Sequence, residues 1–258
     1  FVEAMVFGAF EKDQAKKVVE MFNSKTGTVG INRAETFELA HLQLEKPEDI
    51  QYVDNLLVNN SCFFRKYEIG KDSPKTRAMS MVIDKVLQQP FYTEMRTNQQ
   101  LGYIVWSYTR NIKNTYFLNF LIQSGVYSGD ELDKRADKFI YSSAESEIVK
   151  LDENTFKQII ESCIEELEKK PMSISEKATK LKRAIFEYDI NYLRDEETIE
   201  VLNQINKEDV VSLFNEVISP KSRKMINIVT FAENHKNTSQ LKSSITDLKK
   251  WKSSRIYK

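Results

Sequence analysis

The feature that most constrains the fold is a change of hydrophobic period around residues 90–105, which read PFYTEMRTNQQLGYIV. Before this segment, apolar residues recur every three or four positions, as on one face of an α-helix. These residues are Met79, Val82, Ile83, Val86 and Leu87. Ser73 and Pro74 suit the N-cap and the first position of that helix. From Tyr103 onward the period is two, so the segment predicts a helix that leads directly into a strand.

Two residues predict how this junction is built. Pro90 lacks an amide hydrogen and crowds the preceding turn, so we expect it to kink or restart the helix. Gly102 tolerates a left-handed conformation, so we expect it at the helix end. Arg96 and Tyr103 lie at the same junction. Judged by residue type alone, they are more often a helix-end charge and a core aromatic than a functional site.

The remaining periodicity predicts alternating strands and helices. Strands are expected at residues 2–10, 37–44, 61–69, 103–110, 116–123 and 225–231, with an exposed link over 46–54 and a tight turn over 111–114. Helices are expected at residues 13–22 with Val18, Val19 and Phe22 inward, at 156–167, after Ser173 with Glu176 as a capping box, and after Asn206. Hairpins mixed with helices favour an α+β fold, with a largely antiparallel sheet covered by helices.

Composition divides the chain and excludes several kinds of partner. The polar and glycine-containing residues 23–34 suggest a connector, which gives domains at 1–34 and 35–231 and a lysine-rich tail at 232–258. That tail is expected to dock weakly or to be partly mobile. Lysine plus arginine and aspartate plus glutamate both total 38, so no net charge favours nucleic acid or an anionic membrane. No apolar run reaches the roughly twenty residues of a membrane-spanning helix.

The usual catalytic and metal-binding motifs are missing. His41 and His235 are the only histidines, and HxxEH, GxSxG and phosphate-loop patterns do not occur. A zinc site in this chain is therefore not expected; His41 is expected to be structural and His235 solvated. Cys62 and Cys163 are too few for a disulfide framework, and Cys163 lies on an apolar helical stripe, where a buried free thiol is expected.

Several segments carry a resemblance to a known family. Residues 90–105 resemble the segment that follows the central helix of the last domain in the insulin-degrading enzyme, nardilysin and pitrilysin group of M16 zinc metallopeptidases. Residues 206–218 (NKEDVVSLFNEVI) resemble a helix near the end of that domain, and 245–252 (ITDLKKWK) resemble the C-terminal tail. Residues 2–10 (VEAMVFGAF) resemble the end of the third domain. The resemblance implies an M16 metallohydrolase fold, of the kind shared with LuxS and the mitochondrial processing peptidase, cut from a longer polypeptide.

The resemblance also implies roles and partners. Arg96 would hold a substrate main-chain carbonyl, and Tyr103 would donate its hydroxyl to the oxyanion that develops at the scissile bond. Zinc would be bound by the N-terminal catalytic half of the same polypeptide, the substrates would be peptides, and this chain alone would be inactive. Homo-oligomers of the parent are compatible with the resemblance, and its compartment stays open. The alternatives are a non-catalytic M16-like binding or assembly subunit and a purely structural domain.

Aromatic residues surround the same junction. Phe91, Tyr92, Trp106 and Tyr108 are either core residues or the wall of a pocket for hydrophobic peptide side chains. For Phe91 the core reading is favoured. Because side chains alternate along a strand, Trp106 should be buried if Tyr103 faces the substrate.

Overall fold

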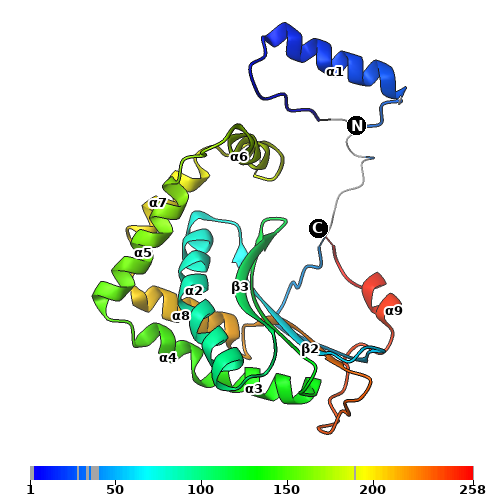
Figure 1. The fold of residues 1–258 in the computed structure, drawn as a ribbon, viewed down its shortest axis with the longest axis vertical. Helices are drawn as coiled ribbons and strands as arrows, with labels where there is room; N and C mark the ends of the chain where they lie inside the picture. Colours follow the sequence, from blue (N-terminus) through cyan, green and yellow to red (C-terminus); the bar gives the residue numbers. More distant parts are fainter. Residues whose placement is uncertain (1–2, 28, 33–34, 36–40, 189, 258) are drawn as a thin grey trace. The chain divides into compact units, whose positions relative to one another are not determined.

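The computed structural model describes residues 3–27, 29–32, 35, 41–188 and 190–257. Its residues pack into two compact units, Phe1–Ala40 with Lys169–Tyr192 and His41–Glu168 with Leu193–Lys258. Figure 1 traces both. The domain boundaries predicted after residues 34 and 231 stay a prediction.

The second unit is built on a five-stranded sheet in its described part. The strands are β1 (Glu48–Asn55), β2 (Ser61–Lys71), β3 (Ile104–Ile112), β4 (Thr115–Ser124) and β5 (Lys224–Phe231), in the order β1-β5-β2-β4-β3. Only the β1 and β5 pair is parallel; the other neighbours are antiparallel. The predicted α+β class with a largely antiparallel sheet is therefore confirmed.

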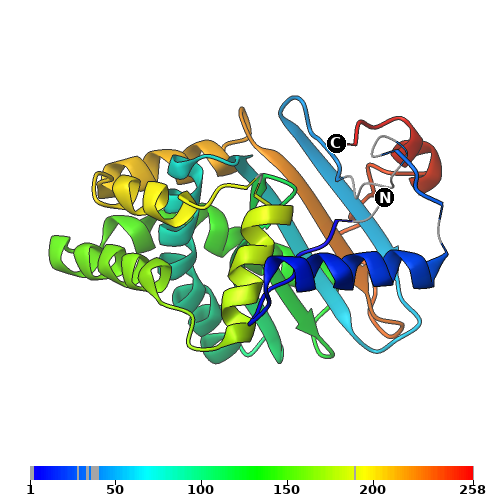
Figure 2. The same cartoon turned by 90° about the horizontal axis from the view of Figure 1, so that it is seen from above.

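Helices cover one face of this sheet. They are α2 (Pro74–Tyr92), α3 (Gly129–Ser142), α4 (Ala144–Val149), α5 (Glu153–Glu168), α7 (Arg194–Leu202) and α8 (Lys207–Ile218). Figures 1 and 2 show α2, α5 and α8 on one side of the sheet and the short α9 (Leu248–Ser253) on the other. The sequence analysis did not single out α3, α4 or α7.

The core lies between α2 and the inner face of the sheet. All five residues of the predicted helical stripe are at most 5% exposed, and so are Phe63, Tyr67 and Phe120 opposite them. Ser73 caps α2 by accepting a hydrogen bond from the Thr76 amide at 3.1 Å, as predicted. Burying an apolar side chain of this size stabilises the fold by about 2 kcal/mol, so this stripe fixes α2 on the sheet.

The predicted hairpin is confirmed, and its turn is tight. Ile112 pairs with Thr115, which leaves Lys113 and Asn114 as a two-residue loop. Both loop residues have positive φ, at 48° and 58°. This is the geometry of a type I′ turn, whose twist matches the twist of the flanking strands.

The predicted helices of the second half are also present. In α5 the predicted stripe faces inward at Phe156, Ile160 and Cys163. In α8 the Asn206 side chain and Asp209 form a reciprocal capping box. In α6 (Ile174–Phe186), which belongs to the first unit, Ser173 caps the Glu176 amide, but the Glu176 carboxylate accepts from the Met172 amide instead of completing the box.

Several predictions near the start of the chain are wrong. The link expected over residues 46–54 is mostly strand β1, where Ile50 is 1% exposed and pairs with Ile226. Residues 3–10 form no strand. Helix α1 (Lys12–Thr26) is present, but it has no buried residue, and Phe22 is 54% exposed because little in its own unit covers that face. The strand predicted over 37–44 lies partly outside the described residues; Leu42 makes an isolated bridge to Tyr257.

The lysine-rich tail docks on the outer face of β1. Ile245 and Trp251 pack with Ile50 in a second apolar cluster. Arg255 donates two hydrogen bonds to the Glu48 carboxylate, at 2.6 and 2.7 Å. Of the helix suggested by the apolar spacing, only the six residues of α9 form.

A polar cluster ties the start of α2 to α7. Asp72 accepts hydrogen bonds from Arg194 at 2.6 and 2.9 Å and from Arg77 at 3.2 and 3.3 Å. Arg77 also pairs with Glu197 at 2.7 Å. Burial alone would raise the pKa of Asp72, but the two guanidinium groups outweigh it, so the pKa lies below its ordinary value.

This cluster predicts a pH-dependent loss of stability. We expect Asp72→Asn to lower the free energy of unfolding by about 2 kcal/mol at pH 7, because hydrogen bonds to a charged group are lost. The folded-state pKa is depressed, so the contribution of Asp72 is complete above its unfolded pKa and disappears as the pH falls through the folded value. Urea unfolding between pH 7 and pH 3 measures this, with the exposed Glu216→Gln as control. A difference from wild type that stays constant with pH would contradict the role.

The helix-to-strand junction differs from its prediction in two respects. Helix α2 continues through Pro90 to Tyr92 and passes directly into a π-helix, η2 (Thr93–Asn98). Pro90 lies in the last turn of α2, where the buried Phe91 holds the helix in place. The left-handed residue is Gln100, with φ 54°, and not Gly102.

Gly102 is required for a different reason. A Cβ atom at this position would lie 1.9 Å from the carbonyl oxygen of Gln123 on β4. The two backbones therefore approach each other closely, and only a residue without a side chain fits.

We expect Gly102→Ala to destabilise the chain by about 2 kcal/mol, because the backbone must move to admit the methyl group. Gly125→Ala is the matched control, since its Cβ would meet nothing closer than 3.3 Å. Urea denaturation of both variants measures the difference. Equal stability of the two variants would show that the close approach imposes no constraint.

Candidate functional site

The structure brings Arg96 and Tyr103 into contact. Nη1 of Arg96 donates hydrogen bonds to the carbonyl oxygens of Gly102, at 3.1 Å, and of Tyr103. The guanidinium carbon lies 4.5 Å from the ring centroid of Tyr103 and 5.7 Å from that of Tyr92. Cations near aromatic faces are attracted by the ring quadrupole. Arg96 therefore fastens the loop that carries Tyr103.

Tyr103 is presented to solvent. Its side chain is 84% exposed, and its hydroxyl has no hydrogen-bond partner in the described part of the chain. Arg96 is partly buried, and only its Nη1 has an assigned acceptor among the described residues. The pair thus offers one phenol and further guanidinium N–H groups to a ligand.

The π-helix η2 sets the position of Arg96. The Gln99 amide bonds to the Glu94 carbonyl at 3.0 Å, and the Leu101 amide reaches back to Met95 at 2.9 Å. Met95 is fully buried and anchors the wide turn. The Glu94 carboxylate accepts from the Asn98 and Gln99 side chains, which lowers its pKa. Such π-helical turns are rare and are frequent at functional sites. The periodicity of the sequence carries no signal that distinguishes them.

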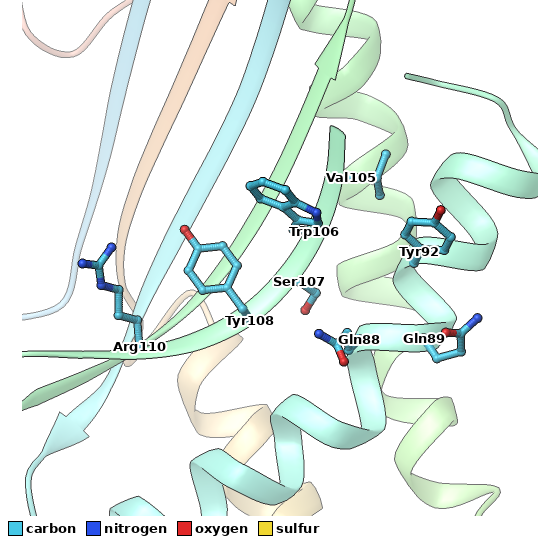
Figure 3. Close-up of a pocket in the computed structure, with 8 residues that line it drawn as sticks. All are labelled: Gln88, Gln89, Tyr92, Val105, Trp106, Ser107, Tyr108 and Arg110. Atoms are coloured by element: carbon cyan, nitrogen blue, oxygen red, sulfur yellow. The ribbon is translucent and has the colours of Figure 1, made fainter. Parts of the chain in front are cut away.

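A groove of about 630 Å³ lies beside this pair, between the end of α2 and strand β3 (Figure 3). Its lining residues are Gln88, Gln89, Tyr92, Val105, Trp106, Ser107, Tyr108 and Arg110. The prediction that Trp106 is buried is wrong, because Trp106 is 55% exposed and Val105 is fully buried. Helix α2 packs on the face of β3 that carries Val105. Tyr103 lies before the first residue of the strand, so alternation along the strand does not determine the direction of its side chain.

The other aromatic residues divide between core and groove. Phe91 is fully buried and packs edge-on against Phe120 and Phe139, at ring-centroid distances of 5.0 and 5.2 Å. The core reading of Phe91 is therefore confirmed. Tyr92 is 37% exposed and lines the groove.

The histidines and cysteines are not among the residues of this junction. His41 contacts the Gln43 side chain at 3.1 Å and the edge of Phe117. His235 is not simply solvated as expected, because its Nδ1 lies 2.8 Å from the Ser61 hydroxyl. Both cysteines are free, and burial raises the pKa of the Cys163 thiol to about 11. The predicted buried free thiol is confirmed.

The described residues do not offer a zinc site. No three of their His, Cys, Asp or Glu side chains gather closely enough to hold a metal ion. Among the same residues, no helix has the length and apolar character needed to cross a bilayer.

Comparison with known proteins shows what this chain is similar to. Residues 82–182 match the family described as PQQ synthase PqqF-like, C-terminal lobe domain 4. The insulin-degrading enzyme of Homo sapiens is 25% identical over 227 residues, which cover 84% of this chain and 22% of the relative. Protease 3 of Escherichia coli is 22% identical over 168 residues, covering 65% of this chain and 17% of the relative.

Solved structures show the same fold. The crystal structure of pitrilysin superposes with a TM-score of 0.79 at 17% identity, over 97% of this chain and 27% of that one. A structure described as a peptidase M16 inactive domain from Pseudomonas fluorescens gives a TM-score of 0.57 at 12% identity, over 86% of this chain and 51% of that one. This chain spans about a fifth of the length of the curated relatives it matches. The chain is similar in sequence and in fold to the C-terminal parts of M16 insulinase-like peptidases.

Proposed function

We infer that this chain is the substrate-binding, chamber-closing C-terminal part of a zinc metalloendopeptidase that hydrolyses peptides. The relatives are named insulin-degrading enzyme and protease 3, which supports the reaction class. The observation that carries the proposal is Tyr103: its exposed ring lies against the guanidinium of Arg96, two residues before Val105, which lines the groove.

The catalytic metal would be bound outside this chain. The described residues lack a cluster of metal ligands, so the N-terminal half of the same polypeptide would supply zinc. When bound, zinc activates a water molecule and polarises the scissile carbonyl. The chain alone is then expected to be inactive, and its partner in the reaction is that N-terminal half.

Within such an enzyme, this chain would supply hydrogen-bond donors. The Tyr103 hydroxyl would donate to the oxygen on which negative charge develops in the transition state. Arg96 would act twice: Nη1 fixes the loop through the Gly102 and Tyr103 carbonyls, and the remaining N–H groups would donate to a substrate main-chain carbonyl. A preorganised donor needs no rearrangement during the reaction, which is why its position matters.

The competing function is a non-catalytic binding or assembly subunit of the same fold. One structural neighbour is described as an inactive domain, so the fold alone does not decide. The exposed Tyr103, held in one position by Arg96, favours the catalytic reading, because an assembly surface does not require an isolated phenol donor.

The test is Tyr103→Phe in the parent polypeptide. We expect kcat for a fluorogenic peptide to fall by about 100-fold, because one transition-state donor is worth about 3 kcal/mol, while KM changes little. The matched control is Tyr192→Phe, which removes another exposed hydroxyl. An unchanged kcat in the Tyr103 variant, or zinc-dependent cleavage by this chain alone, would contradict the proposal.

A further inference from the structure

Strand β3 forms one edge of the sheet. It pairs with β4 on one side only, because the strand order ends at β3. An edge strand presents main-chain N–H and C=O groups that pair with nothing in the sheet. Alternate residues of β3 bond to β4, so the other residues of β3 present these unpaired groups.

Two observations show which residues bond to β4. In a two-residue hairpin, the residues that flank the turn exchange hydrogen bonds, so Ile112 points its main-chain groups toward β4. The Thr109 amide, three residues earlier, donates instead to the Asp84 carboxylate on α2, at 2.6 Å. Odd-numbered residues of β3 therefore direct their main-chain groups outward, and even-numbered residues direct theirs to β4.

Within the described part of the chain, some outward main-chain groups of β3 have a hydrogen-bond partner and others do not. The Thr109 amide donates to the Asp84 carboxylate. No acceptor or donor among the described residues is assigned to the outward main-chain groups of Val105 and Ser107. These two residues line the groove, and Gln88 and Gln89 of α2 line it from the helix (Figure 3).

The hydroxyl of Ser107 also lacks a partner among the described residues. The Ser107 side chain is only 1% exposed, and its Oγ has no hydrogen-bond partner in the described part of the chain. Buried hydroxyls are nearly always paired, so an orphan at a groove is unusual. The exposed ring of Trp106 and the ring of Tyr92 flank the same opening and offer apolar surface.

We propose that the outer edge of β3 at Val105 and Ser107 binds an extended peptide as an added strand. Each of the two residues would exchange an N–H and a C=O hydrogen bond with the peptide main chain, and the groove would hold its side chains. The occupant is a peptide main chain because the free groups alternate donor and acceptor at strand spacing. Because the Thr109 amide is already bound to Asp84, the added strand can pair only with a short segment of β3.

This inference rests on the proposed function and specifies how the substrate is aligned. Tyr103 is the next odd-numbered residue before Val105, about 7 Å along the chain. A peptide paired at Ser107 and Val105 therefore runs toward the exposed phenol and the guanidinium of Arg96. Strand β3 would set the direction of the bound peptide, and Tyr103 and Arg96 would act on the peptide bond that reaches them.

The experiment measures amide hydrogen exchange by NMR on the full 258-residue chain. The probe is a capped ten-residue peptide that alternates valine and threonine, with a lysine at each end. At saturating peptide, we expect exchange at the Val105 and Ser107 amides to slow at least tenfold. The Trp106 and Tyr108 amides, already paired with β4, should not change. A peptide with its three central amides N-methylated should fail to protect either residue.

Two variants separate the main chain from the side chain. Ser107→Pro removes the outward amide, and proline is tolerated where the N–H of an edge strand faces outward, so peptide protection should be lost. Ser107→Ala removes only the orphan hydroxyl and should retain protection of the Val105 amide. The N-methylated peptide tests the same bond on the wild-type chain if the proline variant does not fold.

Three results would overturn the added strand. They are no slowing at Val105 and Ser107 with millimolar peptide, equal protection by the N-methylated peptide, and protection that grows with protein concentration without peptide. The last result would assign the edge to a second copy of the chain. Because no cleavage is measured, the two proposals fail separately: loss of pairing with Tyr103-dependent cleavage intact refutes only the added strand.

Discussion

The packing of the α2 stripe on the inner face of the sheet is the interaction on which the rest of the structure depends. Its buried residues fix the direction of α2, and so they fix where the chain leaves the helix. The fully buried Met95 continues that anchoring into η2. After η2 ends at Asn98, the chain has five residues in which to reach β3, and it passes within contact of the Gln123 carbonyl on β4. The positions of Arg96 and Tyr103 follow from this path.

Patterns of hydrophobic residues were sufficient to predict a helix or strand where that element buries one of its faces. The stripe of α2, the hairpin of β3 and β4, and the capped α8 could all be predicted for this reason. Strand β1 was missed because it carries Glu48, Asp49 and Asp54, whose charges resemble a solvated link. Its place beside β5 comes from non-local pairing, which no local pattern reveals. The face on which Trp106 lies likewise depends on where α2 packs, and not on alternation alone.

The functional junction shows a different limit. Residue types alone favour a helix-end charge and a core aromatic for Arg96 and Tyr103, and only the resemblance to a family changes that reading. The structure shows their contact and the exposure of the phenol. A pocket wall was one of the two interpretations of Tyr92, Trp106 and Tyr108, which do line the groove, but its position between the end of α2 and β3 depends on packing that no local pattern reveals. The orphan hydroxyl of Ser107 is visible only in three dimensions.

The π-helix makes this junction sensitive to the number of its residues as well as to their identity. In a regular α-helix each residue advances about 100° around the axis, and a π-turn accommodates extra residues without moving the flanking segments. Deleting one residue between Thr93 and Asn98 would allow an ordinary helix to form there. Met95 or Arg96 would then rotate by roughly a quarter of a turn, and the anchor and the cation could not both keep their partners. Related chains that preserve this junction should therefore keep its length together with the positions of the anchor and the cation.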